Sequence, residues 1–371
     1  MTESLHARHT AFQTWPITFN ALVVEYTNRC NARCSMCYQY ASPKGSEVSG
    51  RRTLRLGAIK KVIEGASELA PLTKHFLLTG GEPLLSLSRC VALFEHARHH
   101  GYPTISVTTN GFWGRDEEQA YTTVRAMRQA GLTHLDLSWD IWHLDYISPV
   151  AIDNVIAACH REGIAITLRV LTTQRHRIQE ALGLLRYRSL TSVDQIKSGP
   201  VAKMGRATKL LPNRDFFSEQ SAGDTCHARL QLTVNPKGNV SPCYCGSDQT
   251  QGLSFGNIYQ DAIVDIYRRM NDSRLLRTLV FYGAGALVPL LREADIALGR
   301  EDDNICKLCW RVFSDPHRSS ALEHNFARRR SDDVKHLLSA LGIQTIPIQE
   351  VKNETVPIHF RAHDNRTVVR R

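Results

Sequence analysis

The chain has 371 residues, of which 42% are hydrophobic and 22% are charged, and its formal net charge is +10. This length predicts one large domain with a smaller second one, and the hydrophobic content suffices for an ordinary buried core. No stretch of about 18 apolar residues is present, and residues 1–10 are polar, which argues against a membrane span or a secretion signal. We therefore expect a cytoplasmic protein with no membrane partner.

The positive charge and the ten cysteines restrict the partners that we expect. Part of the charge lies in Arg328–Arg330 and in the arginine-rich end of the chain, which is typical of a solvated tail. No basic stretch with interleaved aromatic residues is present, so we expect no nucleic-acid partner. Several cysteines occur in tight pairs, which indicates metal ligation in a reducing compartment rather than a disulfide framework.

From about residue 20 to residue 195, short apolar strands alternate with amphipathic helices at a period of about 30 residues, which is that of a βα unit. Gly101, Gly131 and Gly163 stand where a left-handed cap would end a helix. Six such units predict an α/β fold in which a parallel sheet curls into a partial (β/α)6 TIM-like barrel, with its chemistry at the carboxyl ends of the strands. The expected strands are Leu22–Tyr26, His75–Thr79, Thr104–Thr109, His134–Trp139, Ile164–Val170 and Val193–Ile196, and the clearest helices are Ala58–Leu69 and Pro149–Glu162, the latter capped by Ser148.

The alternation of strands and helices fades after Lys197. The region that follows holds five of the cysteines, and it is expected to form a hairpin, Leu230–Val234 with Asn239–Ser241, and then a helix over Ile258–Met270. A last amphipathic helix is expected around residues 334–341. The sequence predicts four segments: an N-terminal extension (1–19), the barrel (20–207), a small cysteine-rich domain (208–320) and a C-terminal helix with a basic tail (321–371).

Three cysteines follow the first strand. Cys30, Cys34 and Cys37 have the spacing C-x3-C-x2-C. Thiolates are the ligands of iron–sulfur clusters, and three of them leave one iron of a four-iron cluster open to a substrate or cofactor. The alternative is half of a zinc site with a remote fourth ligand, for which a C-x2-C pair is familiar. Two other cysteines, Cys90 and Cys159, lie on apolar helix faces and are expected in the core.

Distinct turns or charged residues follow the next four strands. The second strand ends in Thr79-Gly80-Gly81-Glu82-Pro83, where two glycines allow close approach of the backbone and Glu82 offers a charged acceptor. Thr108–Gly111 ends the third strand, Leu137–His143 ends the fourth, and Arg169 lies at the end of the fifth. Each of these features is ordinary when it is taken alone.

Taken together and in this order, the motifs resemble those of the radical S-adenosylmethionine (radical SAM) superfamily over about residues 22–207. The resemblance implies a [4Fe-4S] cluster held by Cys30, Cys34 and Cys37, with S-adenosylmethionine on its open iron. In that family the Gly-Gly-Glu-Pro turn receives the methionine amino group, a Ser and an Asp reach the ribose, and an apolar residue packs on adenine. An arginine can pair with the methionine carboxylate, or equally form a surface ion pair. The implied cofactor-binding residues are Met36, Tyr38, Gly80, Gly81, Glu82, Pro83, Asn110, Ser138, Asp140 and Arg169.

The later cysteines resemble the SPASM extension that many radical SAM enzymes carry. Its opening spacing, C-x11-G-x4-C, is present and a C-x2-C pair follows, but no cysteine comes after Cys309. The resemblance therefore implies one auxiliary [4Fe-4S] cluster, as in the shorter twitch version, with a structural zinc as the alternative. Cys245 either replaces Cys243 as a ligand or is a free thiol able to donate a hydrogen atom. The implied ligands are Cys226, Cys243, Cys306 and Cys309.

The activity implied by the resemblance is that of a radical SAM oxidoreductase or maturase. A one-electron donor of the flavodoxin or ferredoxin type would reduce the cluster, S-adenosylmethionine would be cleaved to a 5′-deoxyadenosyl radical, and that radical would remove a substrate hydrogen atom. We favour a peptide or protein substrate that is oxidised, cross-linked or epimerised over a small sugar-like intermediate that is dehydrogenated. The rival from another class is a non-catalytic zinc or iron–sulfur module that only holds the fold.

Overall fold

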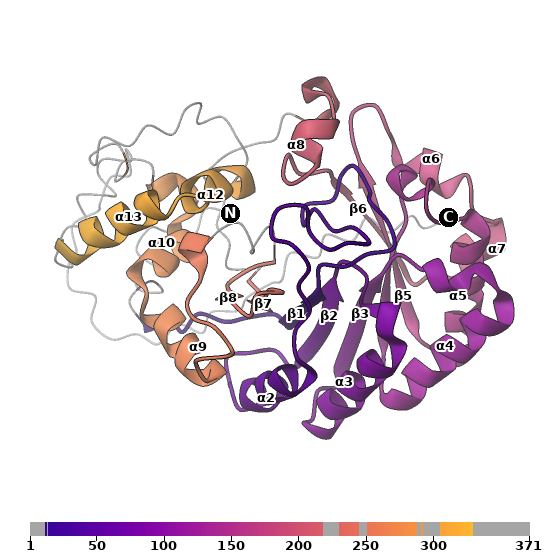
Figure 1. The fold of residues 1–371 in the computed structure, drawn as a ribbon, viewed down its shortest axis with the longest axis horizontal. Helices are drawn as coiled ribbons and strands as arrows, with labels where there is room; N and C mark the ends of the chain where they lie inside the picture. The colour runs from indigo at the N-terminus through magenta and orange to yellow at the C-terminus, as the bar shows by residue number, and fades with distance from the viewer. Residues whose placement is uncertain are drawn as a thin grey trace, which may run out of the picture.

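The computed structural model describes residues 12, 14–217, 230–244, 251–287, 291 and 305–328. Its centre is an eight-stranded sheet with the strand order β6-β5-β4-β3-β2-β1-β7-β8 (Figure 1). Strands β1 to β6 are parallel neighbours in chain order, as successive βα crossovers on one sheet produce. The strands are β1 (Leu22–Thr27), β2 (His75–Gly80), β3 (Thr104–Thr109), β4 (His134–Ser138), β5 (Ala165–Thr172), β6 (Gln195–Pro200), β7 (Leu232–Val234) and β8 (Val240–Ser241).

Helices cover the outer face of this sheet (Figure 1). Outward residues such as Phe76, Val107 and Leu135 are fully buried under the helices. Inward residues at the carboxyl ends, such as Thr108 and Ser138, line a cavity instead. The helices are α2 (Leu56–Ser67), α3 (Leu87–His99), α4 (Glu117–Ala130), α5 (Pro149–Glu162), α6 (Ile178–Leu182), α7 (Tyr187–Thr191), α8 (Ala207–Leu210), α9 (Ile263–Asp272), α10 (Arg274–Tyr282), α12 (Ile305–Phe313) and α13 (Pro316–Arg328).

The sheet does not close on itself, because β6 and β8 are its two edges. This confirms the predicted α/β partial barrel. None of the helices in the described part of the chain is long and apolar enough to cross a membrane.

Local signals in the sequence correctly predicted where α3, α4 and α5 end and how α5 begins. Gly101, Gly131 and Gly163 have φ angles of 74°, 110° and 66°, so all three adopt the predicted left-handed conformation. Ser148 caps α5 by accepting a hydrogen bond from the backbone of Ala151 (3.2 Å), with proline at the first helical position.

The expected helix Ala58–Leu69 is α2, which begins and ends two residues earlier, and two other predicted elements differ more from the structure. The sixth strand was expected at Val193–Ile196, but β6 begins two residues later and continues to Pro200. Most of its side chains are exposed, so pairing with β5 rather than an apolar pattern defines it. The helix expected from Ile258 starts at Ile263, because the preceding residues form a turn in which the Asp261 carboxylate accepts a hydrogen bond from the backbone of Asn257 (3.0 Å).

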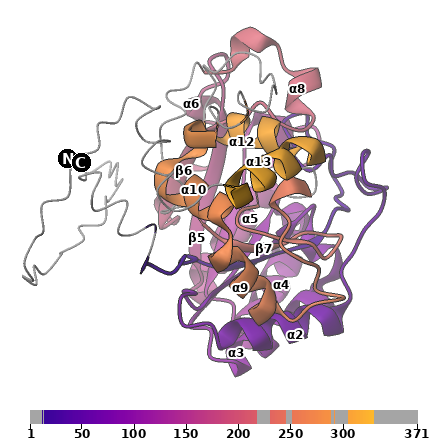
Figure 2. The ribbon, with the colours of Figure 1, turned by 90° about the vertical axis from the view of Figure 1, so that its left-hand side faces the viewer.

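The predicted hairpin is present but joins the barrel sheet. Strands β7 and β8 are antiparallel, and β7 pairs in parallel with β1 over Leu22–Val24. Figures 1 and 2 place α9, α10, α12 and α13 together at this end of the sheet. The predicted boundary between the barrel and the cysteine-rich domain at residue 207 therefore does not separate two sheets, because β7 belongs to the barrel sheet. The helix expected around residues 334–341 lies outside the described residues.

Candidate functional site

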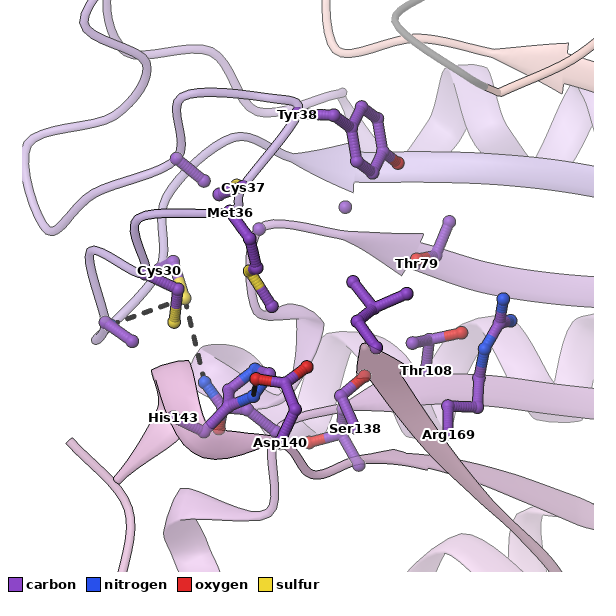
Figure 3. Close-up of a pocket in the computed structure, with 18 of the residues that line it drawn as sticks. Cys30, Met36, Cys37, Tyr38, Thr79, Thr108, Ser138, Asp140, His143 and Arg169 are labelled. Atoms are coloured by element: carbon purple, nitrogen blue, oxygen red, sulfur yellow. Dashed lines mark hydrogen bonds and ion pairs between the residues drawn. The ribbon is translucent and has the colours of Figure 1, made fainter. Parts of the chain in front are cut away.

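A cavity of about 200 Å³ lies at the carboxyl ends of the barrel strands (Figure 3). It is lined by Cys30, Cys34 and Cys37 and by every residue predicted to bind the cofactor except Glu82 and Pro83. In Figure 3 Cys30 and Cys37 lie at one end and Arg169 at the other, with Met36, Ser138 and Asp140 between them. The structure therefore brings together residues from five successive strand ends, as the motifs predict.

The three cysteines sit in the loop that follows β1. Cys30 and Cys34 are buried and Cys37 is half-buried. Burial raises the pKa of the Cys30 and Cys37 thiols, while the Arg206 guanidinium opposes this effect at Cys37. Within the described residues, no three His, Cys, Asp or Glu side chains lie close enough to hold a single metal ion. A four-iron cluster, in contrast, offers a separate iron to each thiolate.

Arg206 holds this loop in place, and the sequence analysis missed it. Its buried guanidinium donates hydrogen bonds to the carbonyl oxygens of Cys34 (3.0 Å) and Ala41 (2.6 Å) and to the Glu47 carboxylate (3.2 Å). Gly205 has a φ of +56°, and a Cβ atom there would lie 2.5 Å from the Cys37 carbonyl oxygen. The pair Gly205-Arg206, which follows shortly after β6 ends at Pro200, is the local signal that could have identified this clamp.

The two glycines after β2 serve the packing of the same loop. The backbone N–H of Gly81 donates to the Thr27 carbonyl (2.6 Å), and that of Glu82 donates to the Arg29 carbonyl (2.8 Å). A Cβ atom on Gly81 would lie 2.1 Å from the Arg29 oxygen. The glycines therefore let two backbone segments meet, and both also line the cavity.

Glu82 lies behind the cavity wall with Pro83, which opens a short 3-10 helix. The fully buried carboxylate of Glu82 accepts hydrogen bonds from the backbone of Leu84 (3.0 Å), the Thr109 hydroxyl (2.9 Å) and the backbone of Asn110 (2.8 Å). These bonds join the end of β2 to the end of β3. Burial nevertheless raises the pKa of Glu82 to about 7.

This raised pKa predicts a pH dependence of stability. In the folded protein Glu82 keeps its proton up to a pH of about 7, whereas in the unfolded chain the ordinary pKa of 4.5 applies. Between these two pH values the folded state therefore binds a proton that the unfolded state has released. The free energy of unfolding should therefore fall as the pH rises from about 4.5 to 7, by on the order of 3 kcal/mol relative to a variant that cannot titrate. Urea unfolding of the metal-free protein and of Glu82→Gln from pH 5 to pH 8 measures this difference, and parallel curves would contradict it.

The ends of β3, β4 and β5 supply the polar wall of the cavity. The Asn110 amide donates to the Cys30 sulfur (3.7 Å) and to the Asn31 side chain (2.9 Å). Asp140 caps the short 3-10 helix Ile141–His143 and contacts His143. The Arg169 guanidinium donates to the Tyr244 hydroxyl (3.4 Å).

Tyr244 is a second residue that the sequence analysis missed. It follows β8 and lines the cavity beside the barrel residues. Its ring centre lies 6.3 Å from that of Tyr38, whose hydroxyl donates to the buried Glu25 carboxylate (2.9 Å). Tyr244 also packs against Val23 and its neighbours on the inner face of the sheet. The cysteine-rich region therefore contributes directly to the wall of this cavity.

The other cysteines divide into two groups. Cys90 and Cys159 are fully buried in the main core, which confirms the prediction for both. Cys243 follows β8, and Cys309 lies in α12 beside the main core. Cys226, Cys245 and the side chain of Cys306 lie outside the described residues, so the auxiliary ligand set stays a prediction.

Two family profiles match the chain, one before and one after residue 207. The profile of the Radical SAM superfamily matches residues 24–171, and that of SPASM, an iron–sulfur cluster-binding domain, matches residues 226–310. A 7,8-dihydro-6-hydroxymethylpterin dimethyltransferase from Methanocaldococcus jannaschii is 27% identical over 54% of this chain and 42% of its own length. A GTP 3′,8-cyclase from Rhodopirellula baltica is 29% identical over 60% of this chain and 59% of its own length. The chain thus spans roughly half the length of these curated relatives.

A solved structure described as His6 tagged anSMEcpe with bound AdoMet shares the fold. It aligns with a TM-score of 0.50 at 14% identity and covers 88% of this chain and 96% of its own. At this identity the likeness concerns the fold alone. On the two matched profiles, the present chain therefore carries a radical SAM domain and a SPASM iron–sulfur cluster-binding domain, and its cofactors are S-adenosylmethionine and [4Fe-4S] clusters.

Proposed function

We propose that this enzyme holds a [4Fe-4S] cluster on Cys30, Cys34 and Cys37, cleaves S-adenosylmethionine reductively there, and removes a hydrogen atom from a substrate at the cavity mouth. The observation that supports it is the single cavity lined by the three thiols and by polar groups from the ends of β2 to β5. When bound, the cluster and S-adenosylmethionine supply a 5′-deoxyadenosyl radical able to break an unactivated C–H bond.

The residues around the cavity fit these two cofactors. The thiols lie in an apolar cluster with Ala32, Trp142 and Val201, which excludes water from soft thiolate ligands. Away from the cysteines the lining becomes polar, as the ribose and methionine groups of S-adenosylmethionine require. The cavity thus has a sulfur end and a hydrogen-bonding end (Figure 3).

The proposed cofactor contacts follow from this arrangement of the cavity. Ser138 and Asp140 would receive the ribose hydroxyls, and Arg169, oriented by Tyr244, would pair with the methionine carboxylate. The amino group would meet the backbone at Gly80 and Gly81. Adenine would pack against Met36 or Tyr38. Glu82 and Pro83 do not line the cavity, so their role would be indirect. Glu82 would hold the backbone of Asn110 in place by accepting its hydrogen bond.

For the auxiliary region we propose one further [4Fe-4S] cluster on Cys226, Cys243, Cys306 and Cys309, with Cys245 as the competing ligand or a hydrogen-atom donor. Four thiolates would complete the coordination of this cluster, which suits an electron relay or a structural clamp. Two clusters predict about eight irons per chain. An external flavodoxin- or ferredoxin-type protein would supply the electron for cleavage.

For the substrate we propose a peptide or protein segment. The supporting observation is β6, an edge strand whose side chains are mostly exposed and which pairs only with β5 among the described residues. An extended peptide can add to such an edge through backbone hydrogen bonds. Val201, the residue after β6, packs in the same apolar cluster as Cys30 and Cys34, so a peptide there would run toward the cavity.

A small-molecule substrate is the second candidate. The names of the curated relatives refer to GTP and to a pterin, which are both small heterocyclic compounds. Such a substrate would enter the cavity itself rather than pair with β6.

Anaerobic reconstitution with iron, sulfide, dithionite and S-adenosylmethionine tests the proposed function. Formation of 5′-deoxyadenosine is the expected result. Mass spectrometry of peptides encoded by adjacent genes, with GTP as the small-molecule comparison, then separates the two substrate classes. If no 5′-deoxyadenosine forms with any of these peptides or with GTP, a non-catalytic module is the better interpretation of the protein.

A further inference from the structure

The surface of the cysteine loop is strongly basic. Residues 29–55 contain six arginine and lysine residues and one acidic residue, Glu47, whereas the whole chain has 46 basic and 36 acidic residues. Residues 195–214, which include the Arg206 clamp, add five basic residues and no acidic one. Glu47 itself is paired with Arg33 and Arg206. Five exposed cations of these two segments, here called the loop cations, are Arg33, Lys44, Arg51, Arg52 and Lys209.

Arg51 and Arg52 are held beside the start of the loop. The buried Asn28 side chain accepts a hydrogen bond from the backbone of Arg52 (2.8 Å) and donates one to the Gly50 carbonyl (2.7 Å). The backbone of Asn28 donates to the Arg52 carbonyl (3.2 Å). Since Asn28 lies two residues before Cys30, these bonds fix the two arginines close to the proposed cluster.

Lys44 and Lys209 lie against the rest of the loop. The backbone of Cys30 donates to the Ser42 carbonyl (3.0 Å), and Lys44 follows Ser42 by two residues. The Lys209 ammonium group lies 5.6 Å from the centre of the Tyr40 ring in the same loop. Figures 1 and 2 both place α8, which carries Lys209, beside the segment that follows β1. The loop cations therefore come from segments that meet around one set of cysteines.

This basic surface lies outside the cavity. None of the loop cations lines the cavity, so they are not placed to contact a cofactor or substrate within it. Cys37 is half-buried, which brings the cysteine end of the cavity close to the surface. Val48 and Leu210 are 59% and 50% exposed and add apolar contact area. Within residues 29–55 and 195–214, all of which the structure describes, no aromatic side chain is exposed, so a platform for stacking nucleic-acid bases is absent there.

We infer that the loop cations, together with Val48 and Leu210, form the docking surface for the electron donor, a small protein that is acidic around its own redox centre. The inference rests on the proposed cluster and donor. One electron passes from the donor, which is oxidised by one electron, to the cluster on Cys30, Cys34 and Cys37, which is reduced by one electron, and no bond is formed or broken.

The position and the charge of this surface both favour such a donor. Electron transfer slows steeply with distance, so the donor must approach the surface nearest the cluster, which the loop cations surround. Complementary charges speed the encounter of two proteins more than they strengthen the final complex. Transient redox complexes also bury little surface, for which a few cations and two apolar side chains suffice. The β6 edge, which is proposed for the substrate, stays free.

Charge reversal at three loop cations tests the docking surface. The test variant combines Arg51→Glu, Arg52→Glu and Lys209→Glu, none of which alters a residue that lines the cavity. The reconstituted protein is reduced by an acidic flavodoxin with its NADPH-dependent reductase or by saturating dithionite, a small reductant that needs no docking surface. One measurement is the initial rate of 5′-deoxyadenosine formation. The other is the binding of oxidised flavodoxin to the metal-free protein, by isothermal titration calorimetry.

The matched control variant combines Arg125→Glu, Arg128→Glu and Arg161→Glu. These exposed residues lie on α4 and α5, which belong to the helical layer over the outer face of the sheet. Arg161 lies over the ring of Tyr121, as Lys209 does over another tyrosine ring. The two variants therefore carry the same change in net charge at different places.

With flavodoxin at low salt we expect the rate of the test variant to fall at least about tenfold, and its binding of flavodoxin to weaken. The difference from the parent should shrink at high salt, because exposed charges are then screened. With dithionite the test variant should match the parent, and the control variant should match it with both reductants.

Several outcomes overturn the inference. They are an unchanged rate of the test variant with flavodoxin, an equal loss in the control variant, and a loss with dithionite as large as that with flavodoxin, which damage to the cluster site would explain. Weaker binding of a substrate peptide with unchanged reduction by flavodoxin would assign the surface to the substrate. A parent that is reduced by dithionite but by neither flavodoxin nor an acidic ferredoxin overturns the inference too. A parent that forms no 5′-deoxyadenosine with dithionite would refute the proposed function itself.

Discussion

Replacing Cys30 with alanine is expected to abolish cleavage of S-adenosylmethionine and to lower the iron content from about eight to about four atoms per chain. Cys30 is buried, lines the cavity with the other two thiols and receives the Asn110 amide. Loss of a residue that merely supports a metal ligand typically costs 10–100-fold, so loss of a ligand itself should cost more than about 100-fold. The measurements are iron analysis and the rate of 5′-deoxyadenosine formation under anaerobic conditions.

The matched control for this prediction is Cys159→Ala. Cys159 is fully buried in α5, packs in the main core and does not line the cavity. Its replacement should lower the free energy of unfolding by about 1 kcal/mol through the small cavity that it leaves. Iron content and cleavage should match those of the parent. Equal behaviour of Cys30→Ala and Cys159→Ala in both measurements would remove the basis of the proposed function.

Replacing Arg206 with methionine is expected to destabilise the cysteine loop by about 2–5 kcal/mol. The guanidinium is 2% exposed and donates to two backbone carbonyls within the loop and to Glu47. Methionine keeps much of the apolar volume, but it leaves those buried carbonyl oxygens without their charged donor. The free energy of unfolding of the metal-free protein, from anaerobic urea titration, measures the cost. Retention of iron after gel filtration measures the effect on the site.

Arg33→Met is the matched control for Arg206→Met. Arg33 contacts the same Glu47 carboxylate, but its side chain is 54% exposed. Exposed ion pairs contribute about 0–1 kcal/mol, so the control should change stability by less than that and leave iron binding intact. If the two substitutions cost the same, the clamp by Arg206 would contribute no more than a surface pair.

Part of the candidate site could be read from the sequence because its residues occupy strand ends. In strands β2 to β5 the outward residues are apolar and the inward residues are mostly polar, so alternation marked the strands and their carboxyl ends. Parallel neighbours bring those ends to one edge of the sheet, which is why the cysteine loop, Asn110, Ser138 and Arg169 meet in one cavity. The β6 strand lacked this signal, because its residues are exposed and only its pairing defines it.

The residues that were missed act across long separations in the chain. Arg206 lies 172 residues from the Cys34 carbonyl that it binds, and Tyr244 lies 75 residues from Arg169. No periodicity connects such positions, since each pattern reports only neighbours on one helix or strand. The orientation of Glu82 was equally hidden, because the same motif is compatible with a carboxylate that faces a ligand and with one that faces Thr109 and the Asn110 backbone.

The sequence by itself determined the alternation of strands and helices, the three cysteines of the loop and the resemblance to the radical SAM superfamily. Each of these depends on residues that are close together in the chain. The tertiary structure alone decided that β7 joins β1 and that Arg206 clamps the cysteine loop. These contacts depend on how the sheet curls and on which buried donors find acceptors. The curl of the sheet and the pairing of buried donors are set by packing and by the cost of leaving a buried polar group unpaired. No local sequence pattern records either of them.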